Sequence, residues 1–145
     1  MPPGSGSSPS DRAQRFRTTR QAHADETAED YVEAVGEIIA RRGECRVRDL
    51  AAMMGVSHVT VSRIIARLCE LGLVRTEPYR PIELTLRGER LAARARQRHE
   101  QVVAFLRAIG VSPKQAEIDA EGIEHHVSRE TLRAMDRVTR ERTGP

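Results

Sequence analysis

The chain has 145 residues, of which 39% are hydrophobic and 31% charged, which is typical of one globular domain or two very small ones. It contains no apolar run of roughly eighteen residues and no apolar N-terminal stretch of the signal-peptide type, so we expect a cytosolic protein with no membrane partner. The net charge of +3 permits nucleic-acid binding without establishing it, and the two cysteines match no zinc-binding spacing.

The chain opens with a Pro-, Gly- and Ser-rich stretch that is followed by several arginines, MPPGSGSSPSDRAQRFRTTR. Such a composition cannot build a core, so we predict a disordered basic N-terminal arm over residues 1–24. Either a solubilising tail or a dedicated phosphate-binding arm would explain its charge, and the tail is favoured because basic tails often bind DNA only non-specifically.

Regular structure is predicted to begin near Thr27, because apolar residues recur at helical spacing up to Gly43. A short helix over Val47–Met54, a turn at Gly55 and a longer helix that begins after Ser57 then follow closely. This order of short helix, tight turn and longer helix predicts a helix-turn-helix.

Two short strand-like runs come next, Leu73–Glu77 and Ile82–Leu86, and a Pro/Tyr/Arg/Pro turn joins them. A hairpin directly after a helix-turn-helix is the wing of a winged helix. We therefore predict a winged helix-turn-helix DNA-binding domain over residues 25–86.

The remaining part, residues 87–145, is predicted to be helical. A long helix over about 87–109 is followed by one with Ser112 as N-cap and Pro113 at its first position, and by a last helix that starts near Ser128. This half is too small to fold comfortably alone, so we expect a homodimer formed through it. The predicted fold class is mainly α, with a winged helix-turn-helix followed by an all-α dimerisation domain.

The second helix of the helix-turn-helix begins with small polar residues. That end meets base edges in DNA complexes, where hydroxyls contact bases or phosphates and arginine contacts guanine. A short helix is polar on one face in any case, but the order of turn and wing favours double-stranded DNA as the partner. The predicted DNA-binding residues are Ser57, His58, Thr60, Ser62 and Arg63, with Arg80 at the wing tip, where a solvated turn is an equal alternative.

Three predicted helices also supply carboxylates or histidines. Where one helix supplies several, they are three or four residues apart and so share one face. These residues are Asp30 and Glu33 on the first helix, His99 on the long helix, and Glu121, Glu124 and His125 on the next. Helix geometry turns His126 about 100° away, so it is left out. Solvated helix faces are the alternative explanation. The H-x-x-E-H motif of zinc proteases is not matched, because position 121 is Glu. We predict that the protein is not an enzyme.

Five stretches carry a resemblance to a known family, and in chain order they are EDYVE, GVSHVTVSRIIARLCELGLV, LTLRGERLA, RHEQVVAFLRAIGVS and DAEGIEHHVS. From about Glu29 to Arg140 the chain resembles the diphtheria toxin repressor family of metal-activated winged-helix repressors, and within it the branch of manganese transport regulators. The resemblance implies a homodimer that binds palindromic operators when loaded with metal and represses manganese uptake genes. It also implies that the six residues named above are the metal ligands.

Four carboxylates and two histidines without sulfur form a hard, oxygen-rich donor set, which favours Mn²⁺ and leaves room for two adjacent ions. Fe²⁺, Co²⁺ and Zn²⁺ are expected to compete for it. Pro81 stands where the wing of the family has glycine, which leaves the conformation of the wing tip open. The alternative functions are an iron-responsive regulator of the same family, a metal-independent winged-helix DNA-binding protein and a small metal-buffering protein.

Overall fold

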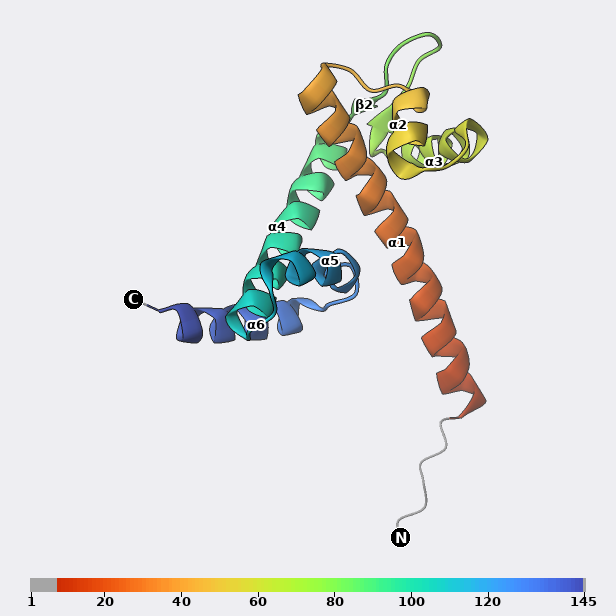
Figure 1. Ribbon diagram of the computed structural model, residues 1–145. Coiled ribbons are helices and arrows are strands. Elements are labelled where there is room, and N and C mark those ends of the chain that lie inside the picture. The colour runs from red at the N-terminus through yellow and green to blue at the C-terminus, as the bar shows by residue number, and fades with distance from the viewer. Residues whose placement is uncertain (1–7, 145) are drawn as a thin grey trace.

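The computed structural model describes residues 8–144, apart from the side chains of residues 18–23 and 25. The fold is mainly α, as predicted, with one two-stranded sheet, and Figure 1 shows the arrangement of its elements. The elements in chain order are α1 (Pro9–Arg42), α2 (Val47–Met54), α3 (His58–Glu70), β1 (Val74–Arg75), β2 (Glu83–Leu84), α4 (Leu86–Ala108), α5 (Pro113–Ile123) and α6 (Arg129–Thr143).

Helix α1 begins much earlier than the sequence suggested. The Ser8 hydroxyl accepts a hydrogen bond from the backbone N–H of Asp11, the Asp11 carboxylate accepts one from the N–H of Ser8, and Pro9 occupies the start of the helix. The prediction of a disordered arm is therefore wrong for residues 9–24, while residues 1–7 lie outside the described part of the chain. Composition outweighed this local capping signal in the prediction. Figure 1 shows the early turns of α1 running away from the rest of the fold.

One hydrophobic core joins the C-terminal half of α1 to α2, α3, the wing and the start of α4. Its most deeply buried side chains include Val32, Val35, Leu50, Val61 and Leu68. This core makes α1 part of the winged helix, so the side chains on its other face have a fixed position relative to the recognition helix α3.

A second core lies where the C-terminal half of α4 packs against α5 and α6. Its buried residues are Val102, Val103, Leu106, Ala116, Ala120 and Leu132. Helix α4 runs through both halves, because its first part packs against α1 and its last part against α5 and α6 (Figure 1). Within residues 8–144, no helix combines the length and the apolar character needed to cross a membrane.

The wing is a short antiparallel hairpin in which Val74 pairs with Leu84 and Arg75 with Glu83, so both strands are shorter than predicted. At its tip, the N–H of Arg80 donates to the carbonyl oxygen of Glu77 at 3.1 Å. Pro78 and Tyr79 are the central residues of this turn, and Tyr79 has a positive φ of 65°. Proline followed by a left-handed residue is the pattern of a type II turn. Tyr79, rather than a glycine at position 81, therefore supplies the left-handed residue of the wing.

Candidate metal centre and nucleic-acid interface

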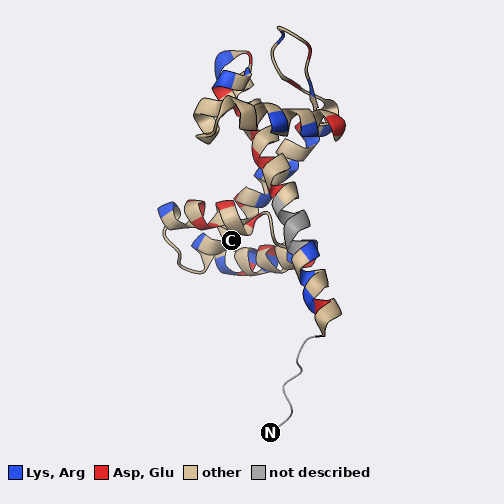
Figure 2. Ribbon diagram, turned by 90° about the vertical axis from the view of Figure 1, so that its right-hand side faces the viewer, with Lys and Arg blue, Asp and Glu red and all other residues tan. Residues whose placement is uncertain are grey.

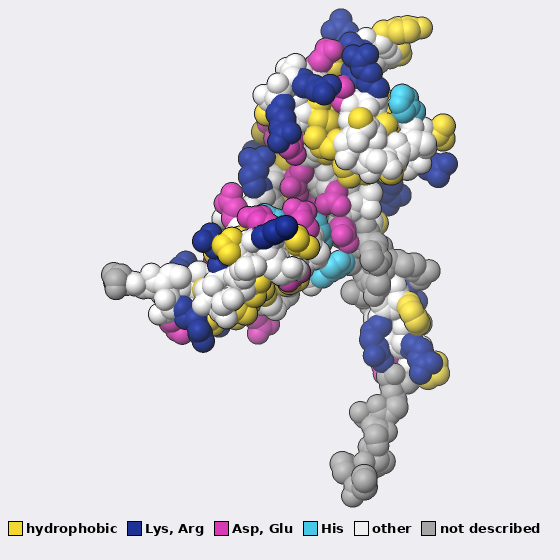
Figure 3. All heavy atoms as spheres, viewed as in Figure 1, with side chains coloured by type: hydrophobic (Ala, Val, Ile, Leu, Met, Phe, Trp, Pro, Cys, Tyr) yellow, Lys and Arg dark blue, Asp and Glu magenta, His cyan; other side chains and the backbone are white. Residues whose placement is uncertain are grey.

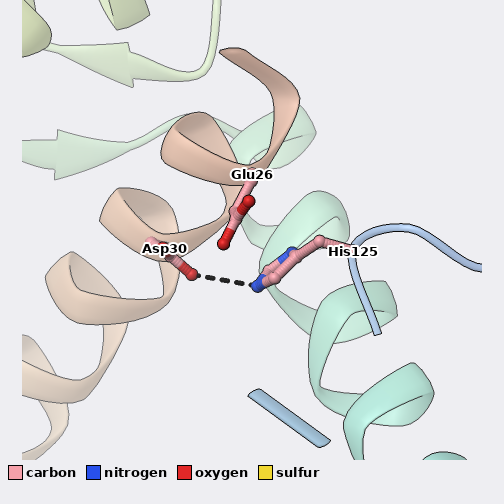
Figure 4. Close-up of side chains that lie close together, drawn as sticks. All are labelled: Glu26, Asp30 and His125. Atoms are coloured by element: carbon pink, nitrogen blue, oxygen red, sulfur yellow. Dashed lines mark ion pairs between the residues drawn. The ribbon is translucent and has the colours of Figure 1, made fainter. Parts of the chain in front are cut away.

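Acidic side chains and histidines gather between the winged helix and the helical half, as Figure 3 shows. Within this group, the ligand atoms of His99, Glu121 and Glu124 all lie within 4.8 Å of one another. Those of Glu26, Asp30 and His125 form a second cluster with the same limit (Figure 4). The structure thus brings five of the six predicted metal ligands into two clusters and adds Glu26, which the sequence prediction missed.

Glu124 connects the two clusters. Its Oε1 lies 3.2 Å from Nε2 of His125, and its Oε2 lies 3.0 Å from Nδ1 of His99. Adjacent ligands of an octahedral ion with bonds of about 2.1 Å lie about 3 Å apart. Each oxygen of this carboxylate therefore lies at the distance from a histidine nitrogen that two neighbouring ligands of one ion would have, so Glu124 could supply a donor to either cluster.

Several donor atoms of the predicted ligands are buried without a well-aligned hydrogen bond, namely Oε1 of Glu33, Nδ1 of His99, Oε2 of Glu124 and Nε2 of His125. The last three lie within 3.2 Å of a group of opposite charge but not in hydrogen-bond geometry. Among the described residues the only other such atom is Nε of Arg98, which is adjacent to His99 in the chain. Burying a polar group without a partner costs about 1–3 kcal/mol. A divalent cation would satisfy these atoms together, so the donor set fits a metal ion. Glu33 belongs to neither cluster but contributes one of these atoms.

The two histidines are held by carboxylates on the nitrogens that face away from the clusters. Nδ1 of His125 lies 2.6 Å from Oε2 of Glu29, and Nε2 of His99 lies 2.7 Å from Oε2 of Glu117. Arg98 in turn forms an ion pair with Oε1 of Glu29. A carboxylate on the outer nitrogen of a histidine fixes the tautomer whose other nitrogen can bind metal. The prediction from sequence missed both carboxylates. Each could have been found from its spacing of four residues to a predicted ligand, Glu117 to Glu121 and Glu29 to Glu33.

The charge state of the clusters reflects burial. Burial raises the pKa of Glu124 to about 7, and the nearby histidines offset this only in part. Burial also raises the pKa of Glu33, with further increases from Asp30 and Glu121. Burial alone would lower the pKa of His125, but the surrounding carboxylates raise it to about 10. The site therefore holds carboxylates whose ionised forms need a nearby positive charge.

The local backbone explains why Glu121 and His125 fall into different clusters. Helix α5 ends at Ile123, Glu124 is its C-cap, and the chain turns over residues 124–126. The assumption of one continuous helix face is therefore wrong beyond residue 123. His126 does leave the face, but its Nε2 lies 3.1 Å from Oε2 of Glu26.

The start of α3 carries most of the predicted DNA-binding residues. The Ser57 hydroxyl caps the helix by accepting from the N–H of Thr60 at 3.1 Å, and the two side-chain hydroxyls lie 2.9 Å apart. His58, Ser62 and Arg63 are exposed. Val59, which the prediction did not include, is 68% exposed beside them, and an apolar side chain at such a position can contact a thymine methyl group.

The wing lies beside α3, with a shallow hollow between them. In the wing, Nε of Arg80 forms an ion pair with Glu77 at 3.3 Å, and the Tyr79 side chain is 98% exposed. Residues from α3, the wing and the start of α2 line the hollow, among them Arg46, Arg48, Ser62, Thr76 and Arg80. Figure 2 shows basic positions on this half and on the early turns of α1.

Comparisons with known proteins match both halves of the chain. Residues 85–143 match the family model described as "Iron dependent repressor, metal binding and dimerisation domain", and residues 37–80 match a MarR family model. The "Transcriptional regulator MntR" of Escherichia coli O6:H1 is 48% identical over 120 residues, which is 83% of this chain and 77% of the relative. The "HTH-type transcriptional regulator MntR" of Lysinibacillus sphaericus is 41% identical over 69% of this chain and 72% of the relative.

A solved structure titled "Manganese-dependent transcriptional repressor complex with manganese" superposes with a TM-score of 0.66 at 29% identity, covering 77% of this chain and 52% of that one. The chain spans about half the length of the solved structures that it matches. A winged helix joined through a carboxylate–histidine site to a metal-binding and dimerisation domain defines the class of metal-responsive DNA-binding regulators. The chain belongs to the MntR family, a family of transcriptional regulators rather than of enzymes, which confirms the resemblance seen in the sequence.

Proposed function

We propose that the protein is a manganese-responsive repressor whose homodimer binds a palindromic operator when metal occupies the site between its two halves. The observation that carries the proposal is the buried Glu124 carboxylate, which contacts both histidines where the halves meet. The proposed ligands are Asp30, Glu33, His99, Glu121, Glu124 and His125. The two clusters joined by Glu124 support two ions in each subunit.

The choice of Mn²⁺ rests on donor chemistry. Carboxylate oxygens and imidazole nitrogens suit Mn²⁺, whereas a site for softer metals would contain thiolate or thioether ligands. The relatives named MntR and the manganese-dependent repressor structure support the same choice. Fe²⁺, Co²⁺ and Zn²⁺ compete for these donors, so selectivity depends on coordination number and geometry.

The coupling to DNA follows from which helices carry the donors. A bound divalent cation supplies the positive charge that lets the crowded carboxylates remain ionised side by side. Asp30 and Glu33 lie on α1, which shares its core with α3, while His99 and Glu121 lie on the helices of the other half. If these side chains bind the same metal ions, they fix the position of α3 relative to the dimerisation half. In the dimer, the two copies of α3 are then held about 34 Å apart, one turn of DNA. Metal favours the conformation with this spacing only to the extent that it binds this conformation more tightly than the others.

DNA binding measured with and without metal tests the proposal. Duplexes selected from a random pool with the Mn²⁺-loaded protein should bind tightly with Mn²⁺ and only non-specifically with a chelator, while sedimentation shows a dimer. Equal binding under both conditions would identify a metal-independent winged-helix protein. Metal binding without selection of any sequence would identify a metal-buffering protein, and activation by Fe²⁺ but not Mn²⁺ an iron-responsive regulator.

Replacing Arg63 by alanine is expected to weaken binding to the selected sequence by about 1–3 kcal/mol if Arg63 contacts guanine bidentately, since it is exposed near the start of α3, the end that meets base edges. Arg67→Ala, in the last turn of the same helix, is the matched control. Fluorescence anisotropy with specific and unrelated duplexes measures both. Equal losses on both duplexes would assign Arg63 to the phosphates, and no loss would remove it from the interface.

A further inference from the structure

Glu26 lies one helical turn before Asp30 on α1 and is not among the six proposed ligands. Figure 4 shows its carboxylate on the same side of α1 as that of Asp30, with both directed toward the ring of His125. The ligand atoms of these three residues all lie within 4.8 Å of one another. A spacing of four residues places Glu26 and Asp30 next to each other on one face of α1.

The cluster contains more than neighbouring acids. The side chain of His125 is only 1% exposed, and its Nε2 has no hydrogen-bond partner although it faces Asp30 Oδ1 at 3.2 Å. Glu29 holds the opposite nitrogen, Nδ1, at 2.6 Å. Nε2 of His125 therefore faces the space that Glu26 and Asp30 border. One imidazole and two carboxylates are the donors that a divalent first-row ion takes.

His126 gives Glu26 a defined position. Its Nε2 lies 3.1 Å from Oε2 of Glu26. The backbone turn at residues 124–126 therefore serves both histidines, since His125 enters the cluster and His126 contacts the carboxylate at its edge. Glu26 is partly exposed, so it lies where the cluster meets solvent.

We propose that Glu26 is a further metal-binding residue, which completes the position on the α1 side together with Asp30 and His125, and that His126 is its positioning residue. This inference rests on the proposed function. It extends the contact between metal and α1 over two turns, from Glu26 through Asp30 to Glu33, so that α1 is held along its length and not at one point. It also adds a hard oxygen donor, which favours Mn²⁺ over softer ions.

Binding of Mn²⁺ alone to the full-length dimer, without DNA, tests the inference. Glu26→Gln keeps the size of the side chain and its ability to hydrogen-bond His126 but removes the charge. We expect calorimetry to show that the affinity for one of the two Mn²⁺ ions falls at least about 10-fold. Loss of a group that only supports a ligand already has an effect of that size. The paramagnetic resonance signal of an interacting Mn²⁺ pair should fall in parallel. His126→Ala should produce a smaller loss at the same ion.

Glu37→Gln is the matched control, because Glu37 lies on the same helix and forms an exposed ion pair with Arg41 at 2.7 Å. This variant should bind Mn²⁺ like the wild type, and thermal unfolding without metal should be the same for Glu37→Gln and Glu26→Gln. Two ions of wild-type affinity in Glu26→Gln would overturn the role of Glu26 and leave the proposed function intact. A wild-type protein that binds no Mn²⁺ would instead overturn the proposed function itself.

Discussion

Replacing Glu124 by alanine is expected to abolish Mn²⁺-activated binding to operator DNA while the dimer stays folded. Its two oxygens contact His125 and His99 at 3.2 and 3.0 Å, so its loss removes a donor from both clusters. We expect the affinity for Mn²⁺ to fall at least about 100-fold, the upper end of the effect seen for groups that only support ligands. The fold should persist, because burial already disfavours the ionised carboxylate and raises the pKa of Glu124 to about 7.

His126→Ala is the contrasting variant, from the same dense run of acids and histidines. His126 contacts Glu26 at the edge of the site and neither bridges the clusters nor faces their interior, so its loss should leave most of the activation intact. Operator binding across a Mn²⁺ titration measures both variants, and circular dichroism checks their folding. Equal, near-wild-type activation in both would mean that these acids and histidines are solvated side chains that bind no regulatory metal, and it would contradict the proposed metal-sensing function.

Gly88→Ala is expected to destabilise the protein by about 3 kcal/mol, the upper end of the usual cost of overpacking. A Cβ at position 88 would lie 2.0 Å from the carbonyl oxygen of Leu73. This neighbour is backbone at the start of the wing and cannot rotate away. The first turn of α4 would have to separate from the strand, which would disturb the path from the wing to the metal site.

Gly122→Ala is the control for this change, since Gly122 also lies in a helix but a Cβ there meets nothing within 4 Å. We expect its stability to be unchanged or to rise by up to about 1 kcal/mol, because alanine favours helix more than glycine does. Urea unfolding without metal at one fixed protein concentration compares the two variants. Matching unfolding midpoints would show that the contact between α4 and the wing is looser than the structure indicates.

Much of the local architecture could be derived from the sequence. The predicted bounds of α2 match the structure, and the serine caps before α3 and α5 lie where predicted, because a cap hydroxyl bonds to the backbone only three residues away. The same local reasoning selected the six carboxylates and histidines that are proposed as metal ligands. The prediction failed at the start of α1. The capping residues Ser8 and Asp11 indicate a helix start there, but the Pro-, Gly- and Ser-rich composition led to the prediction of disorder.

The arrangement of the site was decided by tertiary structure. Helical periodicity relates residues three or four apart, so it can place Asp30 beside Glu33 but cannot say what lies opposite them. The contact between Glu29 and His125 spans 96 positions, and that between Glu29 and Arg98 spans 69. The contact with Arg98 depends on how α1 packs against α4, and the contact with His125 also depends on where α5 ends. The sequence by itself therefore determined the chemistry of the donors and the helices that carry them, whereas only the packing of those helices decided the two clusters, the role of Glu124 between them and the place of Glu26.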